Sequence, residues 1–124
     1  MRVSAGIIRR KDGRFLICRR GLNKSSGGLW EFPGGKIEAG ETPQAALQRE
    51  CAEELAVQLN VGEMLLQVTH SYPHATIHLQ LFACTVESGE PQPLEHQQIC
   101  WVSRAELAQY QFSPADQYFV EKLV

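Results

Sequence analysis

The chain has 124 residues, of which 44% are hydrophobic, and a formal net charge of −2 at pH 7. This length and composition suit one domain, spanning residues 1–124, with its own hydrophobic core. The lack of a positive excess excludes a broad basic surface for a nucleic acid polymer or an anionic membrane, so any anionic ligand must be met by a few residues or a bound cation.

No targeting or membrane segment stands out. The first ten residues lack the uninterrupted apolar run and the small-residue cleavage site of a signal peptide. No stretch approaches the roughly 18 apolar residues that indicate a membrane span. We therefore expect a cytoplasmic protein that does not contact membranes.

The first two predicted elements are short strands. Residues 3–8 and 14–19 are rich in β-branched and apolar side chains, and Lys11-Asp12-Gly13 separates them. An Asp-Gly pair between two such runs is typical of a tight turn. The pattern predicts a β-hairpin.

The next segment leads to the first helix. Residues 23–28 form a polar, glycine-containing loop, and Phe32-Pro33-Gly34-Gly35 is too rich in helix and strand breakers for regular structure. Thr42 followed by Pro43 is typical of an N-cap with proline at the first helical position. We predict a helix from there to about Ala56.

Strands dominate the second half. Residues 61–70 and 76–86 read as strands, the second with partial alternation of apolar and polar side chains, and residues 99–102 form another. Strands interspersed with helices favour an α/β sandwich over a helical bundle or an all-β barrel.

Two helix starts follow these strands. Ser103 with Glu106 three residues later is a capping box, which predicts a short helix. Ser113 followed by Pro114 predicts the start of a last helix that runs to the end of the sequence.

The four cysteines are widely spaced, and each lies in an apolar segment. They are Cys18, Cys51, Cys84 and Cys100. Because none forms a paired Cys-x-x-Cys motif, we expect reduced core residues rather than disulfides or a zinc site.

Three carboxylates gather on one side of the first predicted helix. At 100° per residue, Glu50, Glu53 and Glu54 fall within an arc of about 100°, beside the apolar stripe that includes Leu47. Like charges about 6 Å apart cost roughly 3 kcal/mol at an effective dielectric of 20, and the helix C-terminus disfavours negative charge by a further 0.3–1 kcal/mol or so. A divalent cation would reverse both effects. The alternative is a solvated glutamate face.

The spacing of the residues around these glutamates favours a cation site over a solvated glutamate face. From Gly35 to Val57 the chain resembles the Nudix box, in which a glycine precedes a glutamate by six positions and an Arg-Glu, apolar, any, Glu-Glu run follows eight positions later. The matching residues are Gly35, Glu41, Arg49, Glu50, Glu53 and Glu54. The resemblance implies a Nudix α/β/α sandwich with a mixed central sheet, and an enzyme that cleaves free nucleoside triphosphates to the monophosphate and pyrophosphate.

The box departs from the family pattern at two positions. Cys51 occupies an apolar slot that usually holds a larger aliphatic side chain, and Ala56 stands where the family usually has a helix-ending glycine. Alanine disfavours the left-handed conformation that glycine permits. We therefore expect the helix to end in a different turn.

The resemblance covers most of the chain and is strongest to the MutT-like branch, which removes damaged nucleotides from the pool and so acts in DNA repair. The matching segments outside the box are Arg19-Arg20, the run from Trp30 to Lys36, Glu95, and Ser113-Pro114-Ala115-Asp116. By this resemblance the substrate-binding residues are Arg20, Glu31, Phe32, Pro33, Gly34 and Asp116.

The resemblance also implies a metal site. Mg²⁺ is usually held in proteins by a few carboxylates together with the substrate's phosphates. Here the implied carboxylate ligands are Glu50, Glu53, Glu54 and Glu95, and Gly34 adds a backbone carbonyl. We expect Mg²⁺ as the cofactor, with Mn²⁺ able to substitute.

The remaining box residues have supporting roles. Arg49 is expected to orient the carboxylates, the alternative being an ordinary i,i+4 ion pair with Glu53. Glu41 is expected to fix the loop rather than bind metal. Glu50 is our choice for the general base, with Glu53 and Glu95 as alternatives.

Asp116 decides the expected base preference. At the start of the last helix the dipole would keep its carboxylate ionised, so it would accept from adjacent donors such as those of guanine and 8-oxoguanine. This favours 8-oxo-dGTP. Cytosine presents one donor beside an acceptor, and aspartate also occurs here in relatives that favour CTP and modified pyrimidine nucleotides. Phe32, Tyr72 and Phe112 either stack on the base or pack in the core.

A different class of function is a non-catalytic binding module, like the Nudix-related base-reading domain of adenine glycosylases. Those domains lose the box glutamates, all of which are present here. The expected partner is a free nucleotide, and the oligomeric state is left open.

Overall fold

The computed structural model describes residues 1–24 and 27–123. Its elements are β1 (Arg2–Ile8), β2 (Phe15–Arg19), β3 (Trp30–Glu31), β4 (Gly34–Lys36), α1 (Pro43–Leu55), β5 (Gln58–Tyr72), β6 (Ala75–Ser88), β7 (Gln98–Val102), the 3₁₀ helix η1 (Ala105–Gln109) and α2 (Pro114–Leu123). In this part of the chain, no helix is long and apolar enough to cross a membrane.

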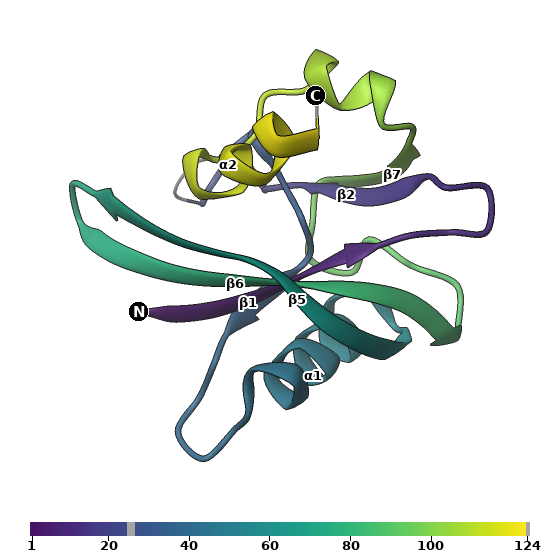
Figure 1. Ribbon diagram of the computed structural model, residues 1–124, viewed down its shortest axis with the longest axis horizontal. Coiled ribbons are helices and arrows are strands. Elements are labelled where there is room, and N and C mark those ends of the chain that lie inside the picture. The colour runs from purple at the N-terminus through teal and green to yellow at the C-terminus, as the bar shows by residue number, and fades with distance from the viewer. Residues whose placement is uncertain (25–26, 124) are drawn as a thin grey trace.

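Two sheets form the centre of the molecule (Figure 1). The first has the strand order β4-β1-β6-β5, with β1 parallel to β6 and antiparallel to β4. The second has the order β3-β2-β7 and is antiparallel. Helix α1 covers one face of the four-stranded sheet, and α2 and the three-stranded sheet lie on its other side. The predicted α/β sandwich with a mixed sheet is confirmed.

The predicted hairpin between the first two strands is wrong. The turn exists, and next to it Arg9 and Phe15 form an isolated antiparallel bridge, but β1 and β2 then diverge into different sheets. Both strands are apolar on both faces and buried along most of their length. Strands of this kind occupy the centre of a sheet, so each takes its own pair of partners.

The Phe32-Pro33-Gly34-Gly35 segment is more regular than predicted. Gly34 and Gly35 belong to β4, paired with Ala5 and Ser4 of β1. A Cβ atom on Gly34 would collide with the backbone of Ser4, so glycine is needed for this close strand approach. Part of the predicted loop over residues 23–28 lies outside the described residues, at positions 25 and 26.

Helix α1 starts as predicted and ends differently. Thr42 is its N-cap, and its hydroxyl accepts from the Ala45 N–H at 3.1 Å. At the other end Ala56 adopts the left-handed conformation, with φ 59° and ψ 38°, and its N–H donates to the Ala52 carbonyl at 3.2 Å. The expectation of a different turn is therefore wrong, because the fold imposes the glycine-type ending on an alanine at a cost in backbone energy.

The later elements follow the prediction, with longer strands. β5 and β6 form one long antiparallel hairpin with bulges between Val61 and Leu66. At η1, Ser103 and Glu106 make the reciprocal capping-box bonds, at 2.8 and 3.2 Å. The last helix begins at Pro114, and residue 124 lies outside the described residues.

The core has two parts. One lies between the sheets and α2 and includes Ile7, Ile17 and Leu81. The other packs α1 against the four-stranded sheet and includes Leu47 and Leu55.

The cysteines are free thiols, as predicted. They are Cys18, Cys51 and Cys84, which are buried, and Cys100, which is half-buried. Burial is the first cause that raises the pKa of each thiol above its usual value. These groups are therefore poor nucleophiles near neutral pH.

Candidate active site

A pocket of about 480 Å³ lies between α1, β4 and the start of α2. Of the sequence-predicted site residues, it is lined by Arg20, Glu31, Phe32, Gly34, Gly35, Glu50, Glu54, Glu95 and Asp116. Four others are not among its lining residues: Pro33, Glu41, Arg49 and Glu53.

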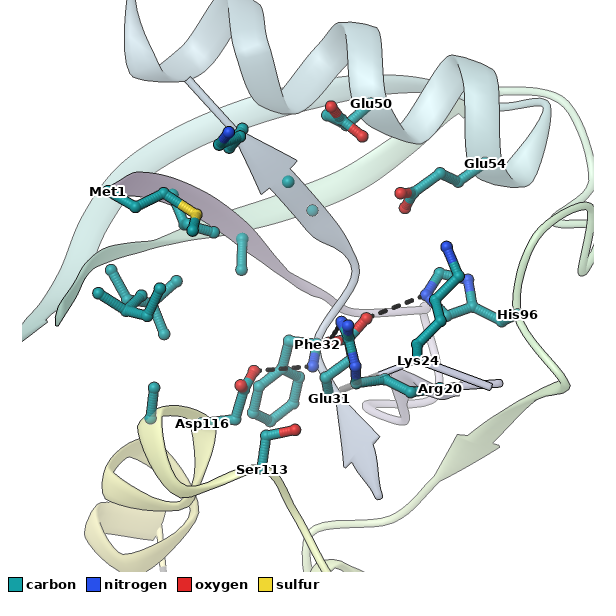
Figure 2. Close-up of a pocket in the computed structure, with 18 of the residues that line it drawn as sticks. Met1, Arg20, Lys24, Glu31, Phe32, Glu50, Glu54, His96, Ser113 and Asp116 are labelled. Carbon is teal, nitrogen blue, oxygen red and sulfur yellow. Dashed lines mark hydrogen bonds and ion pairs between the residues drawn. The ribbon is translucent and has the colours of Figure 1, made fainter. Parts of the chain in front are cut away.

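The pocket has two chemically different ends (Figure 2). At the carboxylate end, Glu50 and Glu54 project from α1, and Glu95 comes from the loop between β6 and β7. At the other end, which we call the Asp116 end, the pocket is lined by Phe32, Ser113 and Asp116. Tyr72 also lines the pocket here, since its hydroxyl accepts from the N–H of Ala115, next to Asp116.

Glycine at position 35 allows the carboxylate end to form. Gly35 lies in β4, and a Cβ atom there would collide with the Glu50 side chain. The Glu50 carboxyl group thus lies directly against the backbone of β4. Any larger residue at position 35 would force the Glu50 carboxyl group to move from this position.

Arg49 holds the glutamates together from behind the pocket. Its guanidinium binds Glu41 through Nε at 2.7 Å and Nη2 at 3.0 Å, and Glu50 through Nη1 at 3.0 Å. Arg49 lowers the pKa of Glu41 to about 2. The i,i+4 contact with Glu53 also exists, at 3.5 Å. Arg49 therefore orients Glu50 and also makes the ordinary helix pair.

Glu54 is the most perturbed group at the carboxylate end. Burial first, and then the neighbouring Glu50, raise the pKa of Glu54 well above its usual range, and Glu31 and Glu95 act in the same direction. Its Oε2 is buried and has no hydrogen-bond partner among the described residues. A buried carboxyl oxygen without a partner, surrounded by other carboxylates, is stabilised by a cation.

The other glutamates are more exposed. The Glu53 side chain is 58% exposed. Glu95 is exposed on its loop, which is fixed to the end of α1 by two backbone bonds: Gln92 N–H to the Leu55 carbonyl at 2.9 Å and Leu94 N–H to the Glu54 carbonyl at 3.2 Å. Within the described residues, no three His, Cys, Asp or Glu side chains are grouped so that they could hold a metal ion.

Asp116 is buried rather than open to the pocket water. It is 7% exposed, and its Oδ1 accepts from the Phe32 N–H at 3.0 Å. Burial first, and then Glu31, raise the pKa of Asp116 to about 8. The expectation that the helix dipole keeps Asp116 ionised is wrong for the unliganded protein, because desolvation outweighs the backbone hydrogen bonds and the charge of Arg20, which lower the pKa.

The aromatic residues at this end divide into wall and core. Phe32 lines the pocket, yet it is also packed between Phe112, with ring centroids 5.3 Å apart, and Phe119, at 5.7 Å. Phe112 is a core residue away from the pocket lining. Tyr72 is half-buried in the wall, and its hydroxyl accepts from the Ala115 N–H at 3.2 Å.

Sequence reasoning missed one prominent pocket residue, His96. Its Nε2 lies 3.1 Å from Glu31 Oε2, while Arg20 Nη1 lies 3.0 Å from the other oxygen, Oε1. Arg20 and Glu31 were both predicted as substrate-binding residues, and the structure pairs them with each other. Only the position of His96 directly after Glu95 could have drawn attention to it.

Comparison with known proteins identifies the family to which this chain is similar. A family model described as the NUDIX domain matches residues 4–122. A CTP pyrophosphohydrolase of Escherichia coli strain K12 is 40% identical over 114 residues, which cover 92% of this chain and 84% of the relative. An 8-oxo-dGTP diphosphatase of Haemophilus influenzae is 34% identical over 124 residues, which cover 100% of this chain and 91% of the relative.

Solved structures share the architecture as well. The solution structure of the E. coli ORF135 protein matches with a TM-score of 0.82 and 38% sequence identity, covering 97% of this chain and 85% of that one.

Proposed function

The chain belongs to the Nudix hydrolase family, and from this premise we propose that it is a pyrophosphohydrolase of free nucleoside triphosphates, which releases the nucleoside monophosphate and pyrophosphate. The proposed substrate is 8-oxo-dGTP, whose removal keeps an oxidised base out of DNA. The named activity of the Haemophilus relative supports this assignment.

One observation carries the proposal: a single pocket joins a cluster of carboxylates, two of them partly buried, to a buried hydrogen-bonding acid. Glu50, Glu54 and Glu95 line one end, and Asp116 lines the other. A nucleotide has the same division, because its phosphates need cationic neutralisation and its base needs hydrogen bonds.

The residues present fit a divalent cation. One buried oxygen of Glu54 has no hydrogen-bond partner among the described residues, and burial and Glu50 raise the pKa of this carboxyl group. A cation would relieve both effects. We propose Mg²⁺, replaceable by Mn²⁺, held by Glu50, Glu53, Glu54, Glu95 and the Gly34 carbonyl. When bound, such an ion neutralises phosphate charge and activates water.

The protein's own residues supply orientation and proton transfer. Arg49 fixes Glu50 by a 3.0 Å bond and is itself fixed by Glu41. We assign Glu50 as the general base. It lines the pocket whereas Glu53 does not, which favours it over Glu53, and Glu95 is the remaining alternative.

The protonation of Asp116 bears on the choice of base. Ionising a group with a pKa of about 8 at pH 7 costs on the order of 1 kcal/mol. Hydrogen bonds to a charged group contribute about 1.5–3 kcal/mol each, so the two donors of a guanine edge can offset this cost. Asp116 would then bind 8-oxoguanine as a carboxylate.

A second candidate substrate follows from the same residue. A neutral Asp116 presents one donor and one acceptor, which match the acceptor and amino donor of cytosine. The E. coli relative is named a CTP pyrophosphohydrolase. Hydrolysis of CTP or a modified pyrimidine nucleotide is therefore the alternative.

The test is a panel of 8-oxo-dGTP, dGTP, CTP and 5-methyl-dCTP, with pyrophosphate release followed in Mg²⁺, in Mn²⁺ and with excess chelator. We expect turnover only with metal and the highest kcat/KM for 8-oxo-dGTP. A preference for the pyrimidines would refute the 8-oxoguanine assignment alone. Full turnover in chelator would refute the metal mechanism, and binding without turnover of any nucleotide would support a binding module instead.

A further inference from the structure

Glu31 connects two parts of the pocket that are far apart in sequence. Its carboxylate lies between Arg20, from the end of β2, and His96, from the loop that precedes β7 (Figure 2). Because a carboxylate only accepts, His96 Nε2 carries the hydrogen of this contact. The loop is thereby attached to β3, the strand that leads into Phe32.

The contact is well protected from water. The side chains of His96 and Glu31 are 7% and 17% exposed. The second ring nitrogen of His96 is buried without a hydrogen-bond partner among the described residues. Glu31 is therefore the group that orients this ring, and the low exposure limits competition from solvent.

The contact between His96 and Glu31 also fixes the loop that carries Glu95. His96 directly follows Glu95, which lines the carboxylate end of the pocket. Backbone bonds hold the loop on both sides: Leu94 N–H donates to the Glu54 carbonyl at 3.2 Å, and Gln97 N–H donates to the Arg19 carbonyl at 3.0 Å. Between these two bonds, the described residues show His96 as the side chain that anchors the loop to the pocket wall.

We propose that His96 is a positioning residue that sets Glu95 at the carboxylate end of the pocket by hydrogen bonding to Glu31. This inference rests on the proposed function, in which Glu95 is a metal ligand. His96 itself touches neither the metal nor the reacting phosphate in this proposal and acts through Glu95.

Three variants test the proposal. His96→Ala removes the contact. His96→Gln retains an N–H donor at a similar reach and is the conservative replacement. His78→Ala removes an exposed histidine of β6 that bonds Thr69, outside the pocket, and is the matched control.

The first readout is amide hydrogen exchange without nucleotide or metal. We expect His96→Ala to speed exchange at Leu94 and Gln97, and His96→Gln to restore most of the protection. The second readout is the Kd for Mn²⁺ alone. We expect His96→Ala to raise it about tenfold, which is typical of losing a residue that orients a ligand, and to lower kcat while KM changes little.

The decisive measurement repeats the Mn²⁺ titration in a Glu95→Gln background. If His96 acts through Glu95, adding His96→Ala there has little further effect. An equal loss in both backgrounds, or no change in exchange and Kd in His96→Ala, would overturn the proposal. The proposal would also be overturned if His96→Gln restored neither the slow exchange at Leu94 and Gln97 nor the Kd for Mn²⁺ while exchange in His96→Ala matched the wild type.

The two levels of proposal fail separately. If the wild-type protein hydrolyses no nucleotide, the proposed function fails, while the exchange and Mn²⁺ measurements still decide the role of His96. If turnover requires Glu54 but His96→Ala matches His78→Ala in every readout, only the role of His96 is refuted.

Discussion

The two ends of the pocket hold acidic side chains in different ways. The carboxylate end brings Glu50, Glu54 and Glu95 together and leaves one Glu54 oxygen without a partner among the described residues. At the Asp116 end, a single acid is more deeply buried but accepts a backbone N–H and holds a raised pKa. The first arrangement needs a cation, whereas the second needs a hydrogen-bonding ligand.

The surroundings of a carboxyl group determine what kind of ligand it can bind. Repulsion between like carboxylates is relieved only by positive charge, so the carboxylate end is specific for charge. Desolvation of one carboxyl group leaves it able to donate or accept, so the Asp116 end can discriminate between base edges. Substitutions at the two ends should therefore change different kinetic quantities.

The largest effect is expected at the carboxylate end. Glu54→Gln removes a charge with almost no change in volume, so the fold should persist while kcat falls by at least about 100-fold for every nucleotide. Glu53→Gln should also lose orders of magnitude in rate if that exposed side chain joins the metal site. Steady-state kinetics across the nucleotide panel measure both.

The control for these variants is Glu41→Gln, because Glu41 binds Arg49 and lies outside the pocket lining. Glu41→Gln should lower kcat less than Glu54→Gln does. If Glu41→Gln lost more activity than Glu54→Gln, the ligand assignment would be wrong. If Glu54→Gln lowered kcat for nucleotides of one base alone, the carboxylate end would affect base preference, and the two ends would not have separate roles.

The carboxylate end is also the part that the sequence predicts best. Glu50 and Glu54 lie four residues apart on one helix, so helical periodicity alone places them on one side, and both line the pocket. The same periodicity included Glu53, which does not line the pocket, and the metal-ligand assignment of all three stays a prediction. Thr42 as the N-cap follows from local capping chemistry in the same way. Such local features can be predicted from neighbouring residues without knowledge of tertiary contacts.

The Asp116 end and the sheet partners could not be derived in this way. Asp116 and Phe32 are bonded across 84 positions of sequence, and the shifted pKa of Asp116 depends on burial that no local pattern shows. The same holds for the divergence of β1 from β2 and for the contact of His96 with Glu31. Ala56 shows the converse case, in which tertiary structure overrides a local preference.

The next largest effect is expected for Asp116→Ala. Removing this acid leaves base donors and the Phe32 N–H unpaired in a closed site, which costs roughly 1–3 kcal/mol, or about ten- to a hundred-fold in kcat/KM. The fall in kcat/KM should appear for the preferred base and be small for nucleotides whose base does not contact Asp116. An unchanged profile across the nucleotide panel would show that Asp116 does not read the base.

The pH dependence of base preference should follow the ionisation of Asp116. The charged groups that act on it are Glu31, which raises its pKa, and Arg20, which lowers it, while Tyr72 has a pKa raised above its usual value. Below a pKa of about 8 the neutral acid suits cytosine, and above it the carboxylate suits 8-oxoguanine. The ratio of kcat/KM for 8-oxo-dGTP to that for CTP should therefore rise with pH, by at most about tenfold between pH 7 and 8.

Asp116→Asn is the control for this measurement, because the amide does not titrate. Dividing the two rates cancels ionisations that both substrates share. A ratio that rises equally in Asp116→Asn, or that falls with pH in the wild type, would contradict the assignment.

A smaller effect is expected on stability without metal. Glu54 is partly buried beside Glu50, whereas Glu53 is exposed and lies 3.5 Å from Arg49. Glu54→Gln should therefore stabilise the protein in chelator by about 1–2 kcal/mol, since it relieves repulsion and desolvation. Glu53→Gln should change Tm little. Thermal melts with chelator and with Mg²⁺ test this, and the advantage of Glu54→Gln should disappear with Mg²⁺.

The smallest effect concerns the end of α1, where the local and tertiary preferences conflict. Ala56 has a φ of 59°, a conformation that costs an L-residue about 1–2 kcal/mol and glycine almost nothing. Ala56→Gly should relieve this strain, but glycine also gains freedom in the unfolded chain, which offsets roughly half of the benefit. We expect a net stabilisation of about 0.5–1 kcal/mol, or a rise in Tm of about 2–4 °C, in chelator and in Mg²⁺ alike.

Because Ala56 lies outside the pocket lining, kcat and KM should stay unchanged in Ala56→Gly. A fall in Tm would show that the helix does not end in the left-handed turn, and a change in kcat would show that this turn helps to set the glutamates of the carboxylate end.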